Sequence, residues 1–445
     1  MPARNAWDFP RIPHAPEVGS LTQNPRTATA TDMHFPDGHD VRMMRSVLET
    51  GGLWTVDTQA PSYQQLRPFN QPDGALSAQL AEAGEEASAA YWETDGFPVH
   101  KGLSTHLANL TGIEQHPDPV AAHVMAVCSG YAYSGVETVS MITARMGLDK
   151  NHCRLISATV DAMFICSRAF LIQSGDGKVV ILCYRGTEPT NLANGLTDVD
   201  VEPERINYQF EDPCASVHAG FYRNVRATRH EVMEALRRAV AGRSVRKPVE
   251  GESDKMPGKL EALYITGHSL GGAMASMMAV MLRHEKKYAA VAELLKGVYT
   301  FGQPMIGDPS FARACESDAE FSRKIIRYVH GDDVIPHFPP VTAGPYEHFG
   351  REYRYRISHL QQSVAGWLRY LGSSYQPQTG AWRETNTYTS QMSSFLGFAL
   401  GATTLAARKS QILRALPVVY SLEDHLPAHY IGALTPGRVS DEFGD

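Results

Sequence analysis

Residues 265–272 read Ile-Thr-Gly-His-Ser-Leu-Gly-Gly. A mostly apolar run, 260–265, leads into this stretch, and a small-residue pattern typical of a helix follows it. We therefore expect a strand, a sharp turn with Ser269 at its apex, and a helix. Gly267 and Gly271 flank the serine because side chains at these positions would clash in so tight a turn.

This turn predicts a nucleophile. A strained strand-to-helix turn lifts the Ser269 hydroxyl out of the sheet and exposes it to a substrate. The backbone N–H of Leu270 and the positive end of the following helix both point toward an oxyanion formed beside Ser269. A bare Gly-x-Ser-x-Gly also occurs by chance, but the strand before it and the helix after it favour the catalytic interpretation.

A serine nucleophile needs a base, and the base needs an acid that orients it. In hydrolases of this architecture, the acid and then the histidine follow the serine along the chain. A strand is predicted at 325–329, and Asp332 and Asp333 come just past its end, where open α/β sheets collect functional residues. We choose Asp333, because the Val-Ile-Pro that follows should fix its backbone, and keep Asp332 as second candidate. The alternative is a solvated acidic turn.

The candidates for the base are five histidines downstream: His337, His348, His359, His425 and His429. His337 shares the loop of the acid and suits a packing role, while His348 begins and His359 ends a predicted strand; His359 stays an alternative. His425 lies in a loop-like stretch with an aromatic residue close behind. Spacing and context favour His425 as the base, with His429 in reserve.

Four blocks of the chain resemble the class 3, or fungal-type, lipase family of the α/β-hydrolase superfamily. They are Val180-Ile-Leu-Cys-Tyr-Arg-Gly-Thr187, Gly267-His-Ser-Leu-Gly-Gly272, Asp333-Val-Ile-Pro-His-Phe-Pro-Pro340 and Asp424-His425. They occur in the order of the family, and the resemblance covers about 120–358 and 420–435. Together the four blocks are far more specific than any one of them.

The resemblance implies a role for each matched residue. Ser269 is the nucleophile, Asp333 the acid and His425 the base. Thr187 supplies one donor of the oxyanion hole through its backbone N–H, helped by its hydroxyl, and Leu270 supplies the second N–H. The residues themselves agree about Thr187, because it follows a predicted apolar strand at the functional edge of the sheet.

Strand and helix patterns alternate through 160–350, so we expect an α/β-hydrolase fold with a mostly parallel sheet flanked by helices and an antiparallel start. The catalytic domain is expected at 119–445, after an N-terminal extension, 1–118, that wraps the core. A helix is predicted over 119–147, and a hairpin joins strands at 162–172 and 178–184 through Asp-Gly.

The gap between the acid and the base is longer than the family norm: 425 − 333 = 92 residues. We therefore expect a helical insertion at about 360–418, before His425. Its large apolar side chains, Phe395 and Phe398 among them, either pack against the helices of the sheet or cover the acyl pocket. Long connections of this kind often act as lids.

Composition and charge indicate which partners, cofactors and cell compartment to expect. The 445 residues carry a net charge of −7, which argues against nucleic acid. The N-terminus has prolines and charges but no apolar signal core, so we expect a cytoplasmic protein, with leaderless export as an alternative. No apolar run reaches the roughly 20 residues of a membrane span. No metal-ligand spacing occurs among the six cysteines, and no cofactor is expected.

The residues and the resemblance together predict a serine carboxylic-ester hydrolase, a lipase that acts on acylglycerol-type esters and contacts a lipid interface transiently. A phospholipase A1 or a short-chain carboxylesterase is the enzymatic alternative. A non-catalytic lipid-binding protein is the remote one, since binding alone needs no nucleophile, acid or base. The sequence leaves the oligomeric state open.

Overall fold

A computed structural model describes most of the expected catalytic domain. The described residues are 99–112, 115–160, 165–186, 203–206, 208, 215–247, 251, 253–356, 381–386, 388–392 and 421–436. All of them lie in one compact unit, residues 88–445. Most of the expected N-terminal extension falls outside the described residues.

An eight-stranded sheet forms the centre of this unit, in the order β1-β2-β3-β6-β7-β8-β9-β10. The strands are β1 (His152–Val160), β2 (Ile165–Gln173), β3 (Val179–Tyr184), β6 (Ala262–His268), β7 (Leu295–Phe301), β8 (Ile325–His330), β9 (Arg351–Arg356) and β10 (Ala381–Thr385). The four neighbouring pairs from β3 to β9 are parallel. The pairs β1/β2, β2/β3 and β9/β10 are antiparallel. The expected mostly parallel sheet with an antiparallel start is confirmed, including the hairpin that joins β2 to β3. A small second sheet joins β4 (Pro203–Arg205) to β5 (Ser216–His218).

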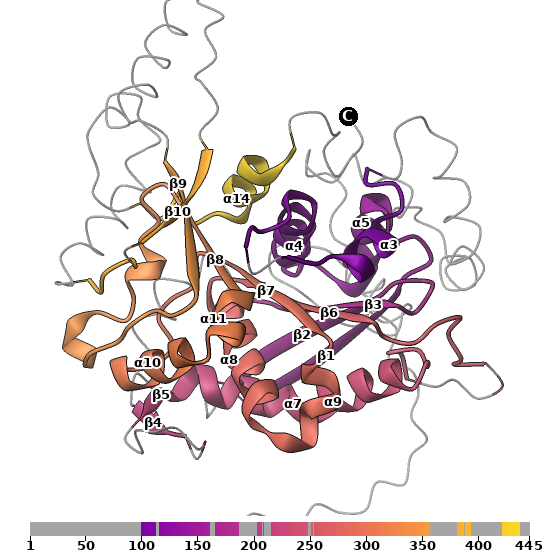
Figure 1. Ribbon diagram of the computed structural model, residues 1–445, viewed down its shortest axis with the longest axis horizontal. Coiled ribbons are helices and arrows are strands. Elements are labelled where there is room, and N and C mark those ends of the chain that lie inside the picture. The colour runs from indigo at the N-terminus through magenta and orange to yellow at the C-terminus, as the bar shows by residue number, and fades with distance from the viewer. Residues whose placement is uncertain are drawn as a thin grey trace, which may run out of the picture. The chain divides into compact units, whose positions relative to one another are not determined.

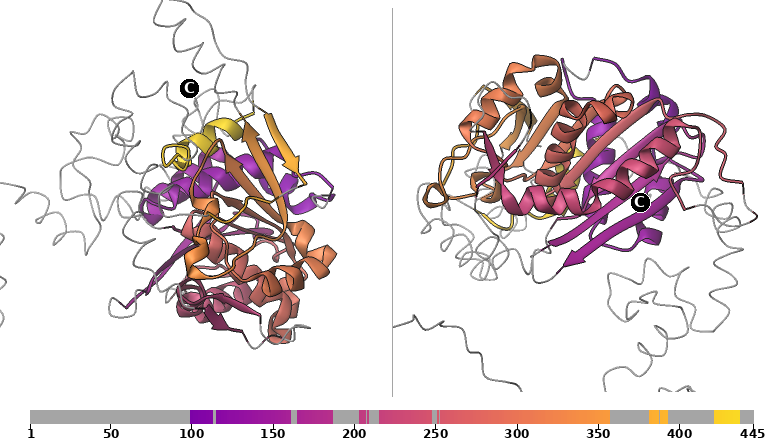
Figure 2. Two further views of the ribbon diagram at one scale, coloured as in Figure 1. Left: turned by 90° about the vertical axis from the view of Figure 1, so that its left-hand side faces the viewer. Right: turned by 90° about the horizontal axis from the view of Figure 1, so that it is seen from below.

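Helices cover both faces of the central sheet (Figures 1 and 2). On one face lie α3 (Leu103–Asn109), α4 (Pro119–Tyr131), α5 (Val136–Met146) and α14 (Pro427–Leu434). On the other lie α7 (Ala219–Val240), α8 (Leu270–His284), α9 (Ala289–Ala292), α10 (Pro309–Ser317) and α11 (Ala319–Lys324). Short 3₁₀ turns occupy Lys286–Tyr288, Ile335–His337 and Val341–Ala343.

Strand β3 shows why the chain forms this three-layer arrangement. All six of its side chains are buried, and they alternate between two separate cores. Val180 and Leu182 pack with α7 and α8, whereas Ile181 and Cys183 pack with α3 and α4. A continuous apolar run of this kind suits a strand that is covered on both faces. The methionines at 274, 277, 278 and 281 of α8 are also fully buried, as a core role requires.

The single helix predicted over 119–147 is wrong, because the chain breaks between α4 and α5. The start is as expected: Pro119 takes the first helical position, and the Asp118 side chain accepts a hydrogen bond from the Ala121 N–H at 2.8 Å. Ser134 ends the helix by donating to the Tyr131 carbonyl from both its N–H and its hydroxyl. Extended Gly135 then begins α5. The break places Tyr133 at the functional edge of the sheet.

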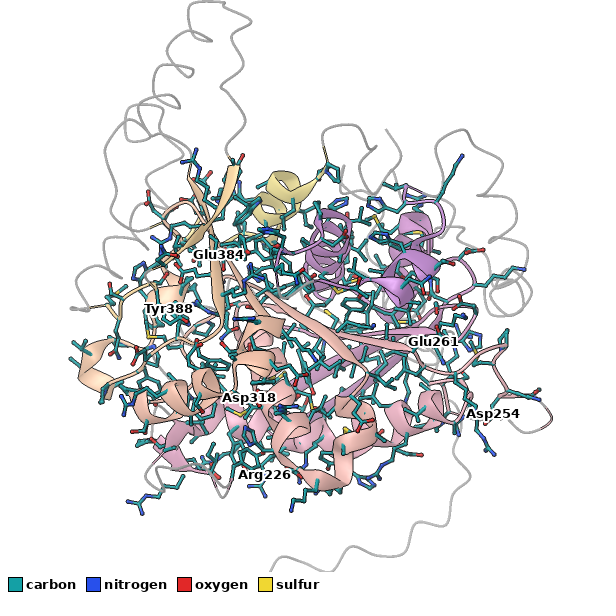
Figure 3. All side chains as sticks on the ribbon, viewed as in Figure 1. Arg226, Asp254, Glu261, Asp318, Glu384 and Tyr388 are labelled. Atoms are coloured by element: carbon teal, nitrogen blue, oxygen red, sulfur yellow. The ribbon has the colours of Figure 1, made fainter. Side chains whose placement is uncertain are left out.

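Four of the five arginines of α7 are paired with acids, and Arg237 contacts the Lys287 carbonyl, as expected for the outer face of a helix that packs on a sheet. Arg229 lies 2.8 Å from Glu285, and Arg226 lies 3.7 Å from Glu204. Figure 3 shows Arg226 at the outer side of this helical layer. Among the helices in the described part of the chain, none has both the length and the apolarity that crossing a bilayer requires.

Candidate active site

The turn between β6 and α8 carries Ser269 in a backbone conformation that side chains rarely adopt. Its φ is 59° and its ψ is −131°, and α8 begins at the next residue. The Ser269 N–H donates to the Phe301 carbonyl at 2.9 Å, and its own carbonyl accepts from Gly272. Strain of about 1–3 kcal/mol at one residue persists only where the surroundings impose it, and such residues cluster at functional sites.

The two glycines beside Ser269 are required by close backbone contacts, as the sequence predicts. A β-carbon on Gly267 would lie 2.3 Å from the backbone of Gly271. One on Gly271 would lie 2.2 Å from the carbonyl oxygen of Tyr184, at the end of β3. These contacts pack the turn against the neighbouring strand, so any larger residue would push β3 and the turn apart.

Of the two expected oxyanion donors, the structure describes Leu270. Leu270 is the first residue of α8, where N–H groups have no acceptor within the helix. Thr187 lies outside the described residues. The last described residue before it, Gly186, is directly against the serine: a β-carbon there would lie 3.3 Å from the β-carbon of Ser269.

The structure brings two of the predicted residues, Asp333 and His425, into direct contact. Nδ1 of His425 lies 2.8 Å and 3.0 Å from the two carboxylate oxygens of Asp333. Both side chains are buried, at 2% and 0% exposed. Asp333 follows β8, and His425 precedes α14, so two segments that are far apart in the sequence meet here. An isolated bridge between Asp333 and Ser421 holds the two segments together.

The environment of Asp333 stabilises its carboxylate. Burial alone would raise the pKa of Asp333, but the adjacent His425 and hydrogen bonds from His425, Tyr430 and the Ile335 N–H hold it below its ordinary value. The Tyr430 hydroxyl donates at 2.5 Å and the Ile335 N–H at 2.9 Å. An ionised carboxylate at Nδ1 keeps the hydrogen of a neutral imidazole on that nitrogen, which leaves Nε2 free to accept a proton.

The hydroxyl of Ser269 and Nε2 of His425 are the two polar atoms left over at this site. Both are buried, and neither has a hydrogen-bond partner among the described residues. Hydrogen bonds between a nucleophile and its base are often long before substrate binds and tighten in the reacting complex. Unpaired polar atoms on the predicted nucleophile and the predicted base are compatible with proton transfer from the serine to the histidine.

The other candidates lie elsewhere. The N–H of Asp332 donates to Asp424, and its carbonyl accepts from Ser421. His429 stacks on His330, with ring centroids 5.3 Å apart. His337 contacts the Ser390 carbonyl through Nδ1 at 2.7 Å, and His348 contacts the Pro336 carbonyl through Nε2 at 2.8 Å. His359 lies outside the described residues.

Three positions that sequence reasoning missed complete the site. Gly302, just past β7, packs against Asp333 and His425. Tyr430 bonds the acid, and His268 contacts the carbonyl of His425 through Nε2 at 2.6 Å. Signals existed for two of them: His268 stands inside the Gly-His-Ser-Leu-Gly stretch, and Tyr430 is the aromatic residue close behind the histidines. Gly302 follows a strand end at the functional edge, which is a weak signal.

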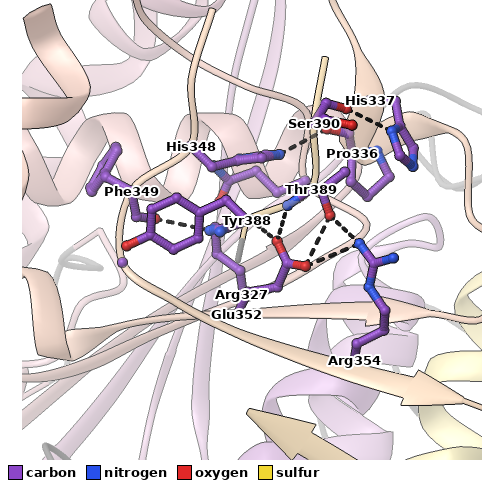
Figure 4. A network of polar contacts seen from close by, with 12 residues as sticks. Arg327, Pro336, His337, His348, Phe349, Glu352, Arg354, Tyr388, Thr389 and Ser390 are labelled. Atoms are coloured by element: carbon purple, nitrogen blue, oxygen red, sulfur yellow. Dashed lines mark hydrogen bonds and ion pairs between the residues drawn. The ribbon is translucent and has the colours of Figure 1, made fainter. Parts of the chain in front are cut away.

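A buried network of charges supports the loop that carries Asp333 (Figure 4). Arg327 of β8 and Glu352 of β9 are 1% and 0% exposed and lie 3.2 Å apart. Burial alone would raise the pKa of Glu352, but the neighbouring cations and the Thr389 N–H lower it to about 2. The segment 388–392, which Glu352 thus holds, bonds the acid loop in turn: the Met392 N–H donates to the His337 carbonyl at 2.9 Å.

The expected insertion at about 360–418 lies mostly outside the described residues, as do Phe395 and Phe398. Its described parts are β10 and residues 386 and 388–392. Trp382 of β10 stacks edge-on against Tyr328, at 4.9 Å between centroids, and donates from Nε1 to the Ala433 carbonyl. These contacts join the insertion to α14 and the central sheet.

Comparison with known proteins adds sequence relatives. A 185-residue stretch is 29% identical to a triacylglycerol lipase, OBL1, of Nicotiana tabacum and covers 39% of this chain and 31% of that protein. A lipase of Rhizomucor miehei is 26% identical over 278 residues, which cover 58% and 69% of the two chains. The chain thus spans about a third of the tobacco relative. A solved Rhizomucor miehei lipase–propeptide complex aligns with a TM-score of 0.45 and 19% identity, over 70% of this chain and 78% of that one.

The family model for Lipase (class 3) matches residues 181–343. This range contains most of β3, the Ser269 turn and the Asp333 loop, together with β6, β7 and β8 of the parallel part of the sheet. Over residues 181–343, this chain is therefore similar to the class 3 lipase family.

Proposed function

We propose that this protein hydrolyses carboxylic esters through Ser269, His425 and Asp333. The observation that carries the proposal is the buried contact between His425 and Asp333 beside the strained turn at Ser269. Oγ of Ser269 attacks the ester carbonyl carbon, and Nε2 of His425 takes its proton and delivers it to the leaving alcohol. Water then attacks the acyl-enzyme with the same base, and the Ser269 hydroxyl is restored.

In this proposal two backbone amides stabilise the charge that develops on the carbonyl oxygen. The Leu270 N–H lies at the start of α8, where the helix dipole also favours negative charge. The Thr187 N–H supplies the second donor, and the position of Gly186 beside Ser269 supports this assignment. Donors aimed at the oxyanion are worth about 10²–10³-fold in kcat each.

The substrate we propose is an acylglycerol-type lipid ester. The match of residues 181–343 to the class 3 lipase family supports it, as do relatives named triacylglycerol lipase and mono- and diacylglycerol lipase. A transient contact with a lipid surface follows from such a substrate. A phospholipase A1 or a short-chain carboxylesterase would use the same residues and differ only in the binding of headgroup and acyl chain.

The test is labelling and hydrolysis with a matched serine control. Wild type should react with a fluorophosphonate probe, Ser269→Ala should not, and the exposed serine of α10 in Ser317→Ala should make no difference. Ser269→Ala and His425→Ala should each lower kcat by about 10⁴-fold while the protein stays folded. Nitrophenyl esters of increasing chain length, then triglyceride and phospholipid emulsions, distinguish the substrate classes. A folded wild type that neither reacts nor hydrolyses any ester would favour a non-catalytic lipid-binding protein.

A further inference from the structure

His268 lies between the nucleophile and the base, on the residue just before Ser269. Its side chain is buried, and its ring centroid lies 4.4 Å from that of His425 and 5.8 Å from that of Tyr430. The triad mechanism uses neither of its nitrogens. A fully buried imidazole in contact with a catalytic one calls for an account of what each ring nitrogen does.

Both nitrogens of His268 are engaged, and the partners define which one carries the hydrogen. Nε2 lies 2.6 Å from the carbonyl oxygen of His425, and Nδ1 lies 2.9 Å from the hydroxyl of Tyr133. A carbonyl oxygen only accepts, so Nε2 must donate. In a neutral ring Nδ1 is then an acceptor, and the Tyr133 hydroxyl donates to it.

The surroundings keep this ring neutral. Burial first, and then the neighbouring His425, lower the pKa of His268 to about 3. A neutral ring with these two partners has one satisfied tautomer, the one with hydrogen on Nε2. Tyr133, whose hydroxyl contacts Nδ1, lies in the break between α4 and α5.

The hydrogen bond to the His425 carbonyl holds the base at a second point. Asp333 contacts the imidazole and so orients the ring, but it leaves the main chain of His425 to be held by other contacts. His268 supplies one of them across 157 positions of sequence, from the strand that ends at the nucleophile. Because His268 and Ser269 are consecutive, this bond relates the backbone of the base directly to that of the nucleophile.

We propose that His268 is a positioning residue for the base. By donating from Nε2 to the His425 carbonyl it sets the position of His425 relative to Ser269, and Tyr133 selects the tautomer that can do so. This inference rests on the proposed function of Ser269 and His425. It concerns a group that touches neither the substrate nor the transferred proton, so its loss should lower kcat and leave KM nearly unchanged.

Two amide variants form a matched pair for the test. In His268→Gln the side-chain NH₂ reaches about the position of Nε2 and can still donate to the His425 carbonyl. In His268→Asn the same group is one methylene short, near the position of Nδ1. We expect kcat for a soluble nitrophenyl ester to fall by about 10²-fold in His268→Asn, as for a misplaced catalytic group, and to stay within about tenfold of wild type in His268→Gln. KM should change by less than about twofold in both, since the hydrogen bond is remote from bound substrate.

Controls separate this inference from the proposed function. Ser269→Ala assayed in parallel reports whether the hydrolysis depends on the serine at all, and urea denaturation reports whether each variant is folded. Equal kcat values for the Gln and Asn variants would overturn the positioning role. Tyr133→Phe keeps the imidazole in place and tests the tautomer should His268→Asn not fold: we expect kcat to fall about 2- to 10-fold, as for one lost hydrogen bond, and an unchanged kcat would overturn the role of Tyr133.

Discussion

Gly302 lies so close to Asp333 that a β-carbon on the glycine would be 2.6 Å from Oδ2 of the acid. The added β-carbon would also be 2.7 Å from Nδ1 of His425. Gly302 also has a φ of 58°, a conformation that favours glycine. The acid and the base therefore both pack against the backbone at the end of β7, and there is no room for a side chain at position 302.

Replacing Gly302 by alanine should separate the acid from the base. We expect kcat to fall by at least about 10²-fold, because the added methyl displaces Asp333, His425 or both. The control is Gly102→Ala, where φ is 71° but no atom lies within 4 Å of the added carbon. That variant should lose about 1–3 kcal/mol of stability from backbone strain alone and keep its kcat. Equal kcat values in the two variants would contradict the prediction.

Tyr430→Phe removes a hydroxyl that donates to Asp333 and accepts from the His330 N–H. We expect a fall in kcat of about tenfold, since the carboxylate loses a charge-assisted hydrogen bond. The free energy of unfolding should drop by about 1–3 kcal/mol, because a buried N–H is left without a partner. Tyr264→Phe, which loses a 2.8 Å bond to the Leu107 carbonyl away from the site, should lose stability and not kcat. A wild-type kcat in Tyr430→Phe would show that the acid needs no such donor.

The Arg327–Glu352 pair should stabilise the fold only while both partners are present. Glu352→Gln leaves Arg327 buried without its counter-charge, and we expect a loss of about 3–5 kcal/mol in urea denaturation at pH 7. The exposed pair of Lys324 and Glu320, 3.2 Å apart, gives the contrast: Glu320→Gln should change stability by no more than about 1 kcal/mol. The double variant Arg327→Met, Glu352→Leu should be more stable than Glu352→Gln. If it is less stable, hydrogen bonds rather than charge hold this network together.

Stability should fall as the solution becomes acidic, because several buried histidines are neutral in the folded protein. Burial, and then His100, lower the pKa of His123 to about 4; burial, and then His429, do the same for His330. The unfolded chain takes up these protons near pH 6.5. The contribution of these two histidines to the free energy of unfolding is therefore complete above pH 6.5 and is lost between pH 6.5 and 4.

The measurement is urea denaturation at pH 7, 6 and 5, with His123→Gln beside wild type. Each proton that only the unfolded state binds contributes about 1.4 kcal/mol per pH unit. His123→Gln removes one such site far from Ser269, so its stability should depend less steeply on pH by about that amount. Parallel curves for the two proteins would mean that His123 binds its proton equally in both states.

Local chemistry explains which parts of this structure could be predicted. The strand, turn and helix around Ser269 follow from an apolar run and from glycines whose contacts are made within a few residues and with the next strand. Asp333 could be placed because acids just past a strand end lie at the functional edge of a parallel sheet. The alternation of β3 between two cores follows from its continuous apolar run.

Contacts between distant segments could not be predicted in this way. The apolar pattern of 119–147 runs on across 132–135, so the break that positions Tyr133 does not show in the periodicity. Gly302 is required by side chains that lie beyond residue 330, and its place after a strand end is only a weak signal of this. His268 acts through a carbonyl 157 positions away. Such roles depend on how whole segments pack, which one sequence read locally does not contain.

The long connection from Asp333 to His425 is anchored at two places, on the edge of the sheet and on the loop that carries Asp333. Arg356 and Ala381 are register partners in β9 and β10. Further on, the Met392 N–H bonds the His337 carbonyl, and the Ser421 N–H bonds the Asp332 carbonyl. Closing a longer loop costs little extra entropy, so the residues between these anchors can change in length while the acid and the base keep their contact. The contact between the acid and the base therefore depends on the residues that anchor the chain on either side of 357–380 and 393–420, and not on the length of those stretches.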